Sequence, residues 1–272
     1  MPANPTAAAA FQKLHTGPDV LILPNAWDAA SARVVENAGA KAIATSSAAV
    51  AWSHGYADGH DLPIARLVTA IEEIARVVHL PLSADAEGGY ADDPAVVGEN
   101  IAALIAAGAV GINLEDGRDT PELHCAKIAA ARDAASRAGV ALYINARTDV
   151  YLKKLVPAEA AVAETITRGR AAKDAGASGL FVPGLVAPSD IAAIVAAVDL
   201  PLNLLAWPGA PSLADLKRLK VRRLSAGTAI VNVALAAVRT ASEALLQKGD
   251  SAALLAAAGA PVNYNALMKR EG

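Results

Sequence analysis

The sequence predicts an α/β protein with a TIM-type (β/α)8 barrel, and three observations lead to this fold class. Short apolar, strand-like segments alternate with helix-like segments along the whole chain of 272 residues. Eight such β-then-α units can be counted, which is the number that a TIM barrel needs. Neither a Pro/Ser/Gly-rich linker nor an early Gly-x-Gly-x-x-Gly turn interrupts the pattern. A single domain over residues 1–272 is therefore favoured, with a Rossmann-type sheet as the alternative.

Strands are predicted where aliphatic and β-branched residues form short buried-type runs. These runs are Val20–Leu23, Ala42–Ser46, Leu82–Glu87, Val110–Glu115, Leu142–Arg147, Gly179–Val182, Leu202–Ala206 and Arg223–Ala226. Ala-rich segments between and after them predict helices, because alanine is the strongest helix former: Ala29–Ala38, Ile64–Val78, Pro94–Ala107, Pro121–Ala138, Ala158–Ala175, Pro188–Ala197, Ser212–Leu219 and Ala229–Gln247. The barrel would span residues 18–247, and a helical tail at 248–272 would lie outside it.

The charge pattern excludes some classes of function. The net charge is −3, and lysines and arginines are scattered, which gives no basis for a nucleic-acid or anionic-membrane partner. The single cysteine, Cys125, excludes an intrachain disulfide and fits a reducing compartment. No stretch approaches the roughly 18 uninterrupted apolar residues of a membrane helix, and the first residues lack the features of a secretory signal. We expect a cytoplasmic protein.

Ionisable and hydroxyl residues stand where the predicted strands end. The central example is Leu82–Gly89, an apolar run that finishes in Asp85 and Glu87. In a strand, residues two apart face the same way, so these acids would converge on one spot. Carboxylates that close together repel each other unless a proton or a cation lies between them. The pair therefore indicates a metal-assisted enzyme.

The next two predicted strands repeat this arrangement. Asn113 and Glu115 share parity, and so do Asn145 and Arg147. In a barrel the chemistry lies at the C-terminal ends of the strands. Three adjacent strands would thus aim acids, amides and one guanidinium into a common cavity, where the acids need partners.

Magnesium is the cation that this set of groups favours. Oxygen ligands without nearby His or Cys suit a hard cation that keeps several waters, with Mn²⁺ as a substitute. We expect Asp85 to contact the metal directly and Glu87 and Glu115 to hold metal-bound water. The alternative is a purely structural network in which Arg147 neutralises the carboxylates and stabilises the barrel mouth.

Other motifs are weaker or missing. The predicted strand ends carry no lysine, which argues against a Schiff-base aldolase, and no His-x-His or Cys-x-x-Cys spacing supports zinc. The Gly227-Thr228 turn is interpreted as a helix cap rather than a phosphate site. Cys125 has helical spacing and is interpreted as packing, and His54 and His60 as solvated loop residues.

Six segments, in this order, resemble the isocitrate lyase/phosphoenolpyruvate mutase superfamily over nearly the whole chain, from Phe11 to the final helix. They are Pro24–Ala32, Ala44–Ser47, Tyr56–Gly59, Asp85–Tyr90, Asn113–Asp116 and Asn145–Asp149. Each is modest alone, but six at the ends of successive barrel units are specific. The resemblance implies a Mg²⁺-dependent enzyme that acts on α-keto or α-hydroxy acids through an enolate-like intermediate.

The resemblance also implies roles for individual residues. Arg147 and Asp58 would be catalytic, and Asp58 would join the metal shell of Asp85, Glu87 and Glu115. The implied substrate contacts are Trp27, Ser46, Ser47, the Ala48 amide, Asp85, Asn113 and Arg147. Family members commonly form tetramers that exchange C-terminal helices, so we expect a homo-oligomer, a dimer of dimers, with the tail exchanged between subunits.

The chain departs from the family's lyases and mutases in one loop. The lyases have a Lys-Lys/Arg-Cys-Gly-His loop after the fourth strand, whereas here Glu115-Asp116 runs almost directly into the helix at Pro121. Cys125 is therefore not carried over as catalytic, and the proton donor stays open among Tyr56, His54 and water.

We expect cleavage or decarboxylation of a C–C bond in a small 2-oxo acid or dicarboxylate. A C–P phosphonomutase or phosphonopyruvate hydrolase is the first alternative. A 2-oxo-acid binding protein without turnover is the second.

Overall fold

The computed structural model describes residues 4–117, 119–249, 251–258 and 262–269. Its strands are all parallel and form one sheet in the order β1-β9-β8-β7-β6-β5-β4-β3-β2. The strands are β1 (Leu21–Leu23), β2 (Asn25–Ala26), β3 (Ile43–Thr45), β4 (Leu82–Asp85), β5 (Gly111–Glu115), β6 (Tyr143–Arg147), β7 (Gly179–Val182), β8 (Leu202–Leu205) and β9 (Arg223–Ser225).

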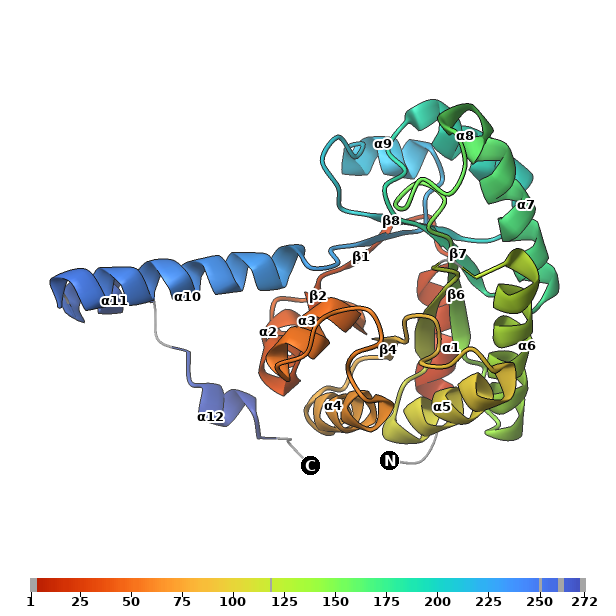
Figure 1. Ribbon diagram of the computed structural model, residues 1–272. Coiled ribbons are helices and arrows are strands. Elements are labelled where there is room, and N and C mark those ends of the chain that lie inside the picture. The colour runs from red at the N-terminus through yellow and green to blue at the C-terminus, as the bar shows by residue number, and fades with distance from the viewer. Residues whose placement is uncertain (1–3, 118, 250, 259–261, 270–272) are drawn as a thin grey trace.

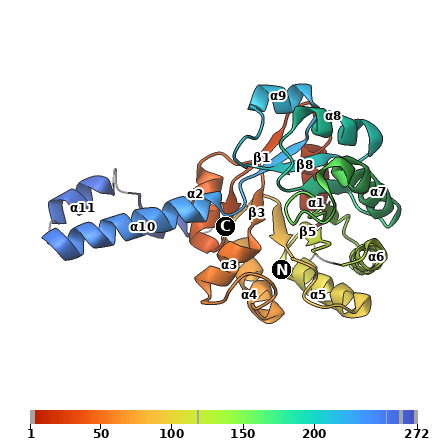
Figure 2. The same cartoon turned by 45° about the horizontal axis from the view of Figure 1, so that its top comes forward.

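The two ends of this order, β1 and β2, are successive pieces of one chain segment divided by Pro24. β1 pairs with β9, and β2 pairs with β3, so the sheet curls into a nearly closed barrel (Figures 1 and 2). Proline has no N–H group to donate, which explains the break within the segment. The predicted TIM-type barrel is confirmed, and the Rossmann-type alternative is wrong because that sheet stays open.

Helices connect the strands and surround the barrel (Figure 2). They are α2 (Ala29–Asn37), α3 (Ser47–Ser53), α4 (Ile64–Val77), α5 (Pro94–Ala107), α6 (Pro121–Arg137), the 3-10 helix η1 (Ala158–Ala160) with α7 (Ala161–Asp174), α8 (Pro188–Ala197) and α9 (Leu213–Arg218). Their ends follow local chemistry. For example, Asp93 caps the amide of Ala95 at the start of α5, and Gly108 ends that helix in the left-handed conformation.

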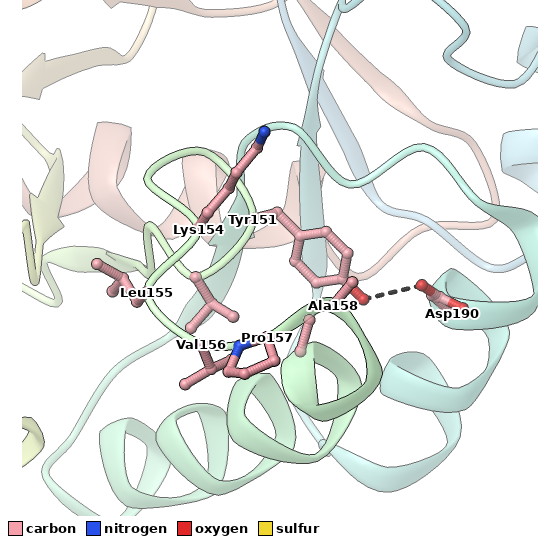
Figure 3. Close-up of a pocket in the computed structure, with 9 residues that line it drawn as sticks. Tyr151, Lys154, Leu155, Val156, Pro157, Ala158 and Asp190 are labelled. Atoms are coloured by element: carbon pink, nitrogen blue, oxygen red, sulfur yellow. Dashed lines mark hydrogen bonds between the residues drawn. The ribbon is translucent and has the colours of Figure 1, made fainter.

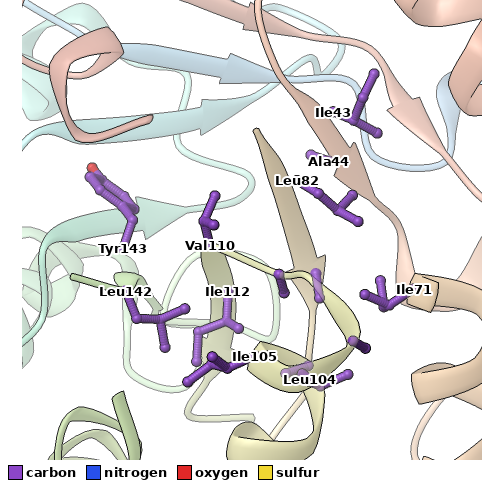
Figure 4. Packing of buried hydrophobic residues seen from close by; sticks show 14 of the residues in the cluster. Ile43, Ala44, Ile71, Leu82, Leu104, Ile105, Val110, Ile112, Leu142 and Tyr143 are labelled. Atoms are coloured by element: carbon purple, nitrogen blue, oxygen red, sulfur yellow. The ribbon is translucent and has the colours of Figure 1, made fainter. Parts of the chain in front are cut away.

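Aliphatic side chains fill the layer between strands and helices. Ile71 of α4 and Leu104 and Ile105 of α5 pack near Leu82 and Ile112 of the neighbouring strands (Figure 4). All five side chains are at most 2% exposed. Burying a side chain of this size stabilises the fold by about 1.5–3 kcal/mol, so this layer fixes β4 and β5, which carry the acids.

The helix α1 (Pro5–Leu14) was not among the predicted elements, and it closes the N-terminal end of the barrel. Its Phe11 ring lies 5.5 Å from the Tyr143 ring, and the His15 ring stacks on Tyr143 at 3.9 Å. A Cβ atom on Gly111 would come within 2.5 Å of Phe11, so this strand position has room only for glycine. Tyr143 and Gly111 are the first residues of β6 and β5, which places the aromatic cluster at the bottom of the barrel.

The chain after the last strand leaves the barrel. The helix α10 (Ala229–Lys248) projects away from it, and α11 (Ser251–Ala257) and α12 (Tyr264–Leu267) follow (Figure 1). Arg33 on α2 donates its Nε–H to the carbonyl of Leu267, 2.8 Å away, so the described end of the tail returns to the barrel. By length and composition alone, α10 could cross a membrane, a candidate that the sequence analysis did not anticipate. A single helix of this kind is weak evidence.

Candidate active site

The turn after β4 carries the two acids that the sequence singled out. Asp85 is the last residue of the strand, whereas Glu87 lies beyond it with a φ of +47°. The expected strand parity of the two is therefore wrong at Glu87. A Cβ on Gly89, which has a φ of +90°, would meet Val97 at 2.6 Å, so the turn needs glycine there. The Glu87 carbonyl accepts the amide N–H of Glu115 at 2.8 Å, which joins this turn to β5.

The two acids have different partners. Asp85 Oδ2 accepts the backbone N–H of Ser47 at 3.0 Å, and its Oδ1 is buried without a partner among the described residues. Glu87 accepts the His60 N–H at 2.6 Å and the Tyr90 hydroxyl at 2.9 Å. Neutral donors therefore hold both carboxylates, and burial without a cation is costly for either one.

The β3 end brings the predicted serine segment to Asp85. Ser46 is the N-cap of α3, and Ser47 and Ala48 form its first turn, where amides have no partner within the helix. The Ser47 hydroxyl is hydrogen-bonded to the Asp58 carboxylate, so Asp58 also faces this side of the mouth. Trp27 follows directly after β2 and is half-buried.

Strands β5 and β6, next to β4 in the sheet, carry an ion-pair cluster. Arg147 Nη1 lies 2.5 Å from Glu115 Oε2, and its Nε lies 2.7 Å from Asp149 Oδ1. Lys153 Nζ is 2.8 Å from Asp149 and 3.7 Å from Glu115. Glu115 and Arg147 are register partners in the sheet, which explains why they meet. This is the network that the structural alternative predicted, and it neutralises only part of the mouth.

Electrostatics reflect the surplus of acids. Burial, with the Asp85 charge as a further cause, raises the pKa of Glu87 to about 7. Burial also raises the pKa of Glu115 to about 7 despite the opposing effect of Arg147. The pKa of Asp58 is raised by loss of hydration and then by Asp85. Protons thus compensate for the mutual repulsion of the acids, as expected of carboxylates that share a site.

The donor set suits a hard divalent cation in one respect. Asp85 offers a buried, unpartnered carboxylate oxygen, and its charge contributes to raising the pKa of both Glu87 and Asp58. In their present positions, no three Asp, Glu, His or Cys side chains of the described residues converge as a cage. Mg²⁺ does not need such a cage, because it commonly binds one or two carboxylates and keeps several waters.

The turn between β5 and α6 is short, and two of its acids, Asp116 and Asp119, are paired. Asp116 is 1% exposed and accepts hydrogen bonds from the Thr148 hydroxyl at 2.6 Å and Arg168 Nη1 at 2.9 Å. Asp119 pairs with the buried Lys127 at 2.6 Å. This agrees with the sequence, in which strand and helix are almost contiguous.

Two further side chains bear on the predictions of proton donors. Cys125 lies on α6, where burial raises the pKa of its thiol, so it stays protonated as expected of a packing residue. His54 caps α3 and contacts the Val50 carbonyl at 3.1 Å. His60, interpreted as a solvated loop residue, instead accepts the Gly88 amide N–H on Nε2 at 3.0 Å and contributes to the site.

Two hollows adjoin the mouth. A polar one of about 190 Å³ is lined by Glu87, Glu115, Lys153 and neighbouring residues. A larger, more apolar one of about 670 Å³ lies on the other side of the β6–α7 loop, where the Tyr151 hydroxyl donates to Asp190 at 3.0 Å (Figure 3). The smaller hollow is lined by Glu87 and Glu115, the acids with raised pKa values, so it is the better candidate for chemistry.

Three groups of this site were not predicted from the sequence. Tyr90 and Asp149 lay inside quoted motifs without an assigned role, and Lys153 lay in the loop after them. The spacing of Asp149 and Lys153, four residues apart, was a usable signal, since such pairs meet on one turn of helix-like chain. Tyr90 has a φ of +60°, a turn geometry that the sequence does not reveal.

Comparison with known proteins bears on this site. A family model described as phosphoenolpyruvate phosphomutase matches residues 11–246. An uncharacterised Mycobacterium tuberculosis H37Rv protein is 33% identical over 86% of this chain and 88% of its own. The Bradyrhizobium sp. oxaloacetate decarboxylase is 29% identical over 79% of this chain and 75% of its own.

Solved structures agree with these matches. A Burkholderia cenocepacia J2315 protein, provisionally named a phosphonomutase, is 43% identical with a TM-score of 0.83, over 87% of this chain and 99% of its own. Oxaloacetate acetylhydrolase is 25% identical with a TM-score of 0.81, over 95% of each chain. The barrel, the ordered motifs and these matches show that the chain belongs to the phosphoenolpyruvate phosphomutase family, within the isocitrate lyase/phosphoenolpyruvate mutase superfamily.

Proposed function

We propose that this protein is a Mg²⁺-dependent enzyme that cleaves or decarboxylates a small 2-oxo acid or dicarboxylate through an enolate. The observation that carries the proposal is the Asp85 carboxylate, whose Oδ1 is buried without a partner among the described residues and whose charge acts on Glu87, Asp58 and Arg147. A site that combines an excess of acids with a guanidinium suits an anionic substrate bridged to the protein by a cation.

The residues divide the work as follows. Asp85 would contact Mg²⁺, and Glu87, Glu115 and Asp58 would hold its water ligands. When bound, the ion would withdraw electrons from the substrate's keto and carboxylate oxygens. Arg147 would bind other oxygens of the substrate and stabilise the charge that develops there. Its guanidinium is already oriented by Glu115 and Asp149, so little reorganisation is needed.

Ser46, Ser47 and the Ala48 amide would receive the substrate carboxylate. Asn113 and Trp27 would complete the wall of the site. The proton would come from Tyr56 or from water, because neither Cys125 nor His54 contacts the acids, and the β5–α6 turn brings no acid of its own beyond Asp116 and Asp119.

Relatives support C–C bond chemistry, since an oxaloacetate decarboxylase, an oxaloacetate acetylhydrolase and a 2,3-dimethylmalate lyase are among them. The provisional phosphonomutase is the relative that favours C–P bond chemistry as a second candidate. We further propose that the protein is cytoplasmic and homo-oligomeric. The exposed side chains of Val233, Val238 and Leu246 on α10 support exchange of the tail between subunits.

Calorimetric titration with oxalate, with and without Mg²⁺, tests the site. We expect binding that depends on Mg²⁺ and weakens about 100-fold in Arg147→Gln, because an oriented charged partner contributes about 2–5 kcal/mol. Metal-independent binding, or none, would overturn the proposal.

Proton and phosphorus NMR then identify the reaction. Oxaloacetate, 2-methylisocitrate and phosphonopyruvate are incubated separately with the Mg²⁺-loaded protein. Consumption of one of the first two supports C–C cleavage, and release of phosphate or rearrangement of phosphonopyruvate supports the C–P alternative. Oxalate binding without turnover across a broad panel would identify a binding protein instead.

A further inference from the structure

A buried arginine lies inside the barrel below the proposed metal site. Arg223 opens β9, is 1% exposed and forms no ion pair with a carboxylate of the described residues. Burial lowers its pKa to about 10, so the guanidinium stays charged near neutral pH. An uncompensated buried charge costs several kcal/mol, which calls for a reason beyond packing.

The contacts of Arg223 run through neutral amides and a hydroxyl. Its Nε donates to Ser225 Oγ at 3.0 Å, and its Nη2 lies 3.5 Å from Asn113 Oδ1. Asn145 Nδ2 donates to the same Asn113 oxygen at 2.9 Å. The Ser225 hydroxyl donates a hydrogen bond to Asn203 Oδ1 at 3.2 Å. The network therefore starts from a group that can only donate.

The Arg223 guanidinium determines the orientation of the neighbouring Asn113 amide. An asparagine amide can be flipped so that oxygen and nitrogen exchange places, and its surroundings decide the orientation. If Asn113 were flipped, its NH2 group would face both the Arg223 guanidinium and the Asn145 NH2 group. Arg223 cannot respond, because a guanidinium has no acceptor atom. The Asn113 oxygen must therefore point down, toward Arg223.

The other half of the Asn113 amide then faces the mouth. Asn113 is the register partner of Asp85 and stands two residues before Glu115. Asn113 is 4% exposed, and its Nδ2 is neither hydrogen-bonded to a described residue nor among the enclosed atoms without a partner, so this nitrogen keeps some accessible surface. The mouth thus contains a neutral N–H donor beside the carboxyl groups.

We propose that Arg223 is a positioning residue that holds the Asn113 NH2 group toward the mouth, where it donates a hydrogen bond to a substrate oxygen. This inference rests on the proposed function for the identity of the ligand. It adds a requirement for the substrate, namely an acceptor oxygen above Asn113, beyond the oxygens held by Arg147.

Substitutions of Arg223 test the inference, because they change whether the side chain opposite Asn113 can accept a hydrogen bond. Lysine also only donates, so Arg223→Lys should keep oxalate affinity in the presence of Mg²⁺ within about twofold. Glutamine both donates and accepts, so Arg223→Gln should let Asn113 flip and weaken oxalate about tenfold, the value of one lost hydrogen bond. Arg218→Met, at an exposed arginine, is the control and should have no effect.

A double-mutant cycle separates positioning from loss of fold. In an Asn113→Ala background, Arg223→Gln should change oxalate affinity by less than twofold, because the amide on which it acts is absent. An equal loss in both backgrounds, or a loss in Arg223→Lys as large as in Arg223→Gln, would overturn the inference.

The amide itself gives a readout without ligand. In crystals at atomic resolution, the carbonyl and amide bonds of Asn113 differ in length, so its orientation can be read directly. Oxygen toward Arg223 in the natural protein, and mixed orientations in Arg223→Gln, are expected. If the natural protein binds no oxalate, the proposed function fails, and this measurement alone decides the inference: the Asn113 nitrogen facing Arg223 would refute it.

Discussion

The two ends of the barrel are built on the same strands, yet one end gathers charged side chains and the other gathers aromatic ones. At the C-terminal end, five carboxyl groups (Asp58, Asp85, Glu87, Glu115 and Asp149) face two cationic side chains, Arg147 and Lys153. At the N-terminal end, Phe11, His15 and Tyr143 pack as an aromatic cluster. One end keeps charge that needs a partner from outside, and the other excludes charge.

The difference appears in the direction of the pKa shifts. Glu87 is protonated more readily than a free glutamate, with a pKa of about 7, whereas burial lowers the pKa of His15 to about 3 and keeps its ring neutral. Arg223 lies between the two ends and contributes to lowering the pKa of His15. We therefore expect substitutions at the mouth to lower activity and substitutions at the bottom to lower the free energy of unfolding.

The largest effect is expected at Asp85. Asp85→Asn removes the charge that would contact Mg²⁺ but keeps the shape of the side chain. Turnover and Mg²⁺-dependent oxalate binding should fall at least about 1,000-fold, while the melting temperature of the metal-free protein stays the same or rises. Steady-state kinetics and calorimetry measure this. Asp133→Asn, at an exposed acid on α6, is the control, and undiminished turnover in Asp85→Asn would refute the metal assignment.

The second effect concerns acid stability at the bottom of the barrel. The unfolded chain protonates His15 near pH 6.5, whereas the folded protein does so only near pH 3. Stability is therefore complete above pH 6.5 and is lost as the pH falls, by about 1.4 kcal/mol per unit and roughly 5 kcal/mol in total. In urea unfolding from pH 7 to 4, the free energy of unfolding should depend less on pH in His15→Gln than in the natural protein. Activity at neutral pH should be unchanged.

Exposed His79 serves as the control for that experiment. His79→Gln should follow the natural protein across the same pH range. Parallel curves for His15→Gln and the natural protein would contradict the role given to the bottom cluster.

A smaller effect, of opposite sign, is expected at Glu87. Its folded pKa of about 7 lies above the ordinary 4.5, so the metal-free protein loses stability as the pH rises through this window. Glu87→Gln removes that cost and should stabilise the metal-free protein by about 2 kcal/mol at pH 8, with little gain at pH 4. Activity should fall, because one holder of metal-bound water is gone. Equal stabilisation at both pH values would show that charge is not the cause.

The smallest effect is expected at Cys125, outside both ends. Cys125→Ser should change kcat/KM by less than about twofold, because the thiol is protonated and lies on α6 away from the acids. A loss of tenfold or more would place this thiol in the mechanism.

Much of the barrel could be predicted because its signals are local. Helices α5 and α8 begin and end at the predicted residues, since Pro94 and Pro188 stand at their first positions. The strand-end acids were also found, because apolar runs stop where the mouth begins. The plug formed by α1 was missed, since an Ala-rich helix gives no indication of which opening it covers.

The site was predicted less fully, for physical reasons. Strand periodicity held for Glu115 and Arg147 but not for Glu87, where the backbone turns left-handed. Lys153 and Tyr90 reach the site from turns, whose course depends on the assembled barrel. The role of Arg223 follows from hydrogen-bond polarity inside a closed ring, which spacing along the chain does not encode.

The ion pairs of Asp116 and Asp119 have a consequence for stereochemistry. Asp116 is held by Arg168 and Asp119 by Lys127, beside the polar hollow that Glu87 and Glu115 also line. If both acids stay there during turnover and water supplies the hydrogen, a carbanion formed at the proposed site can be reached from either face. Product made in deuterium oxide should therefore carry its label in both configurations, where a gated enzyme would give one.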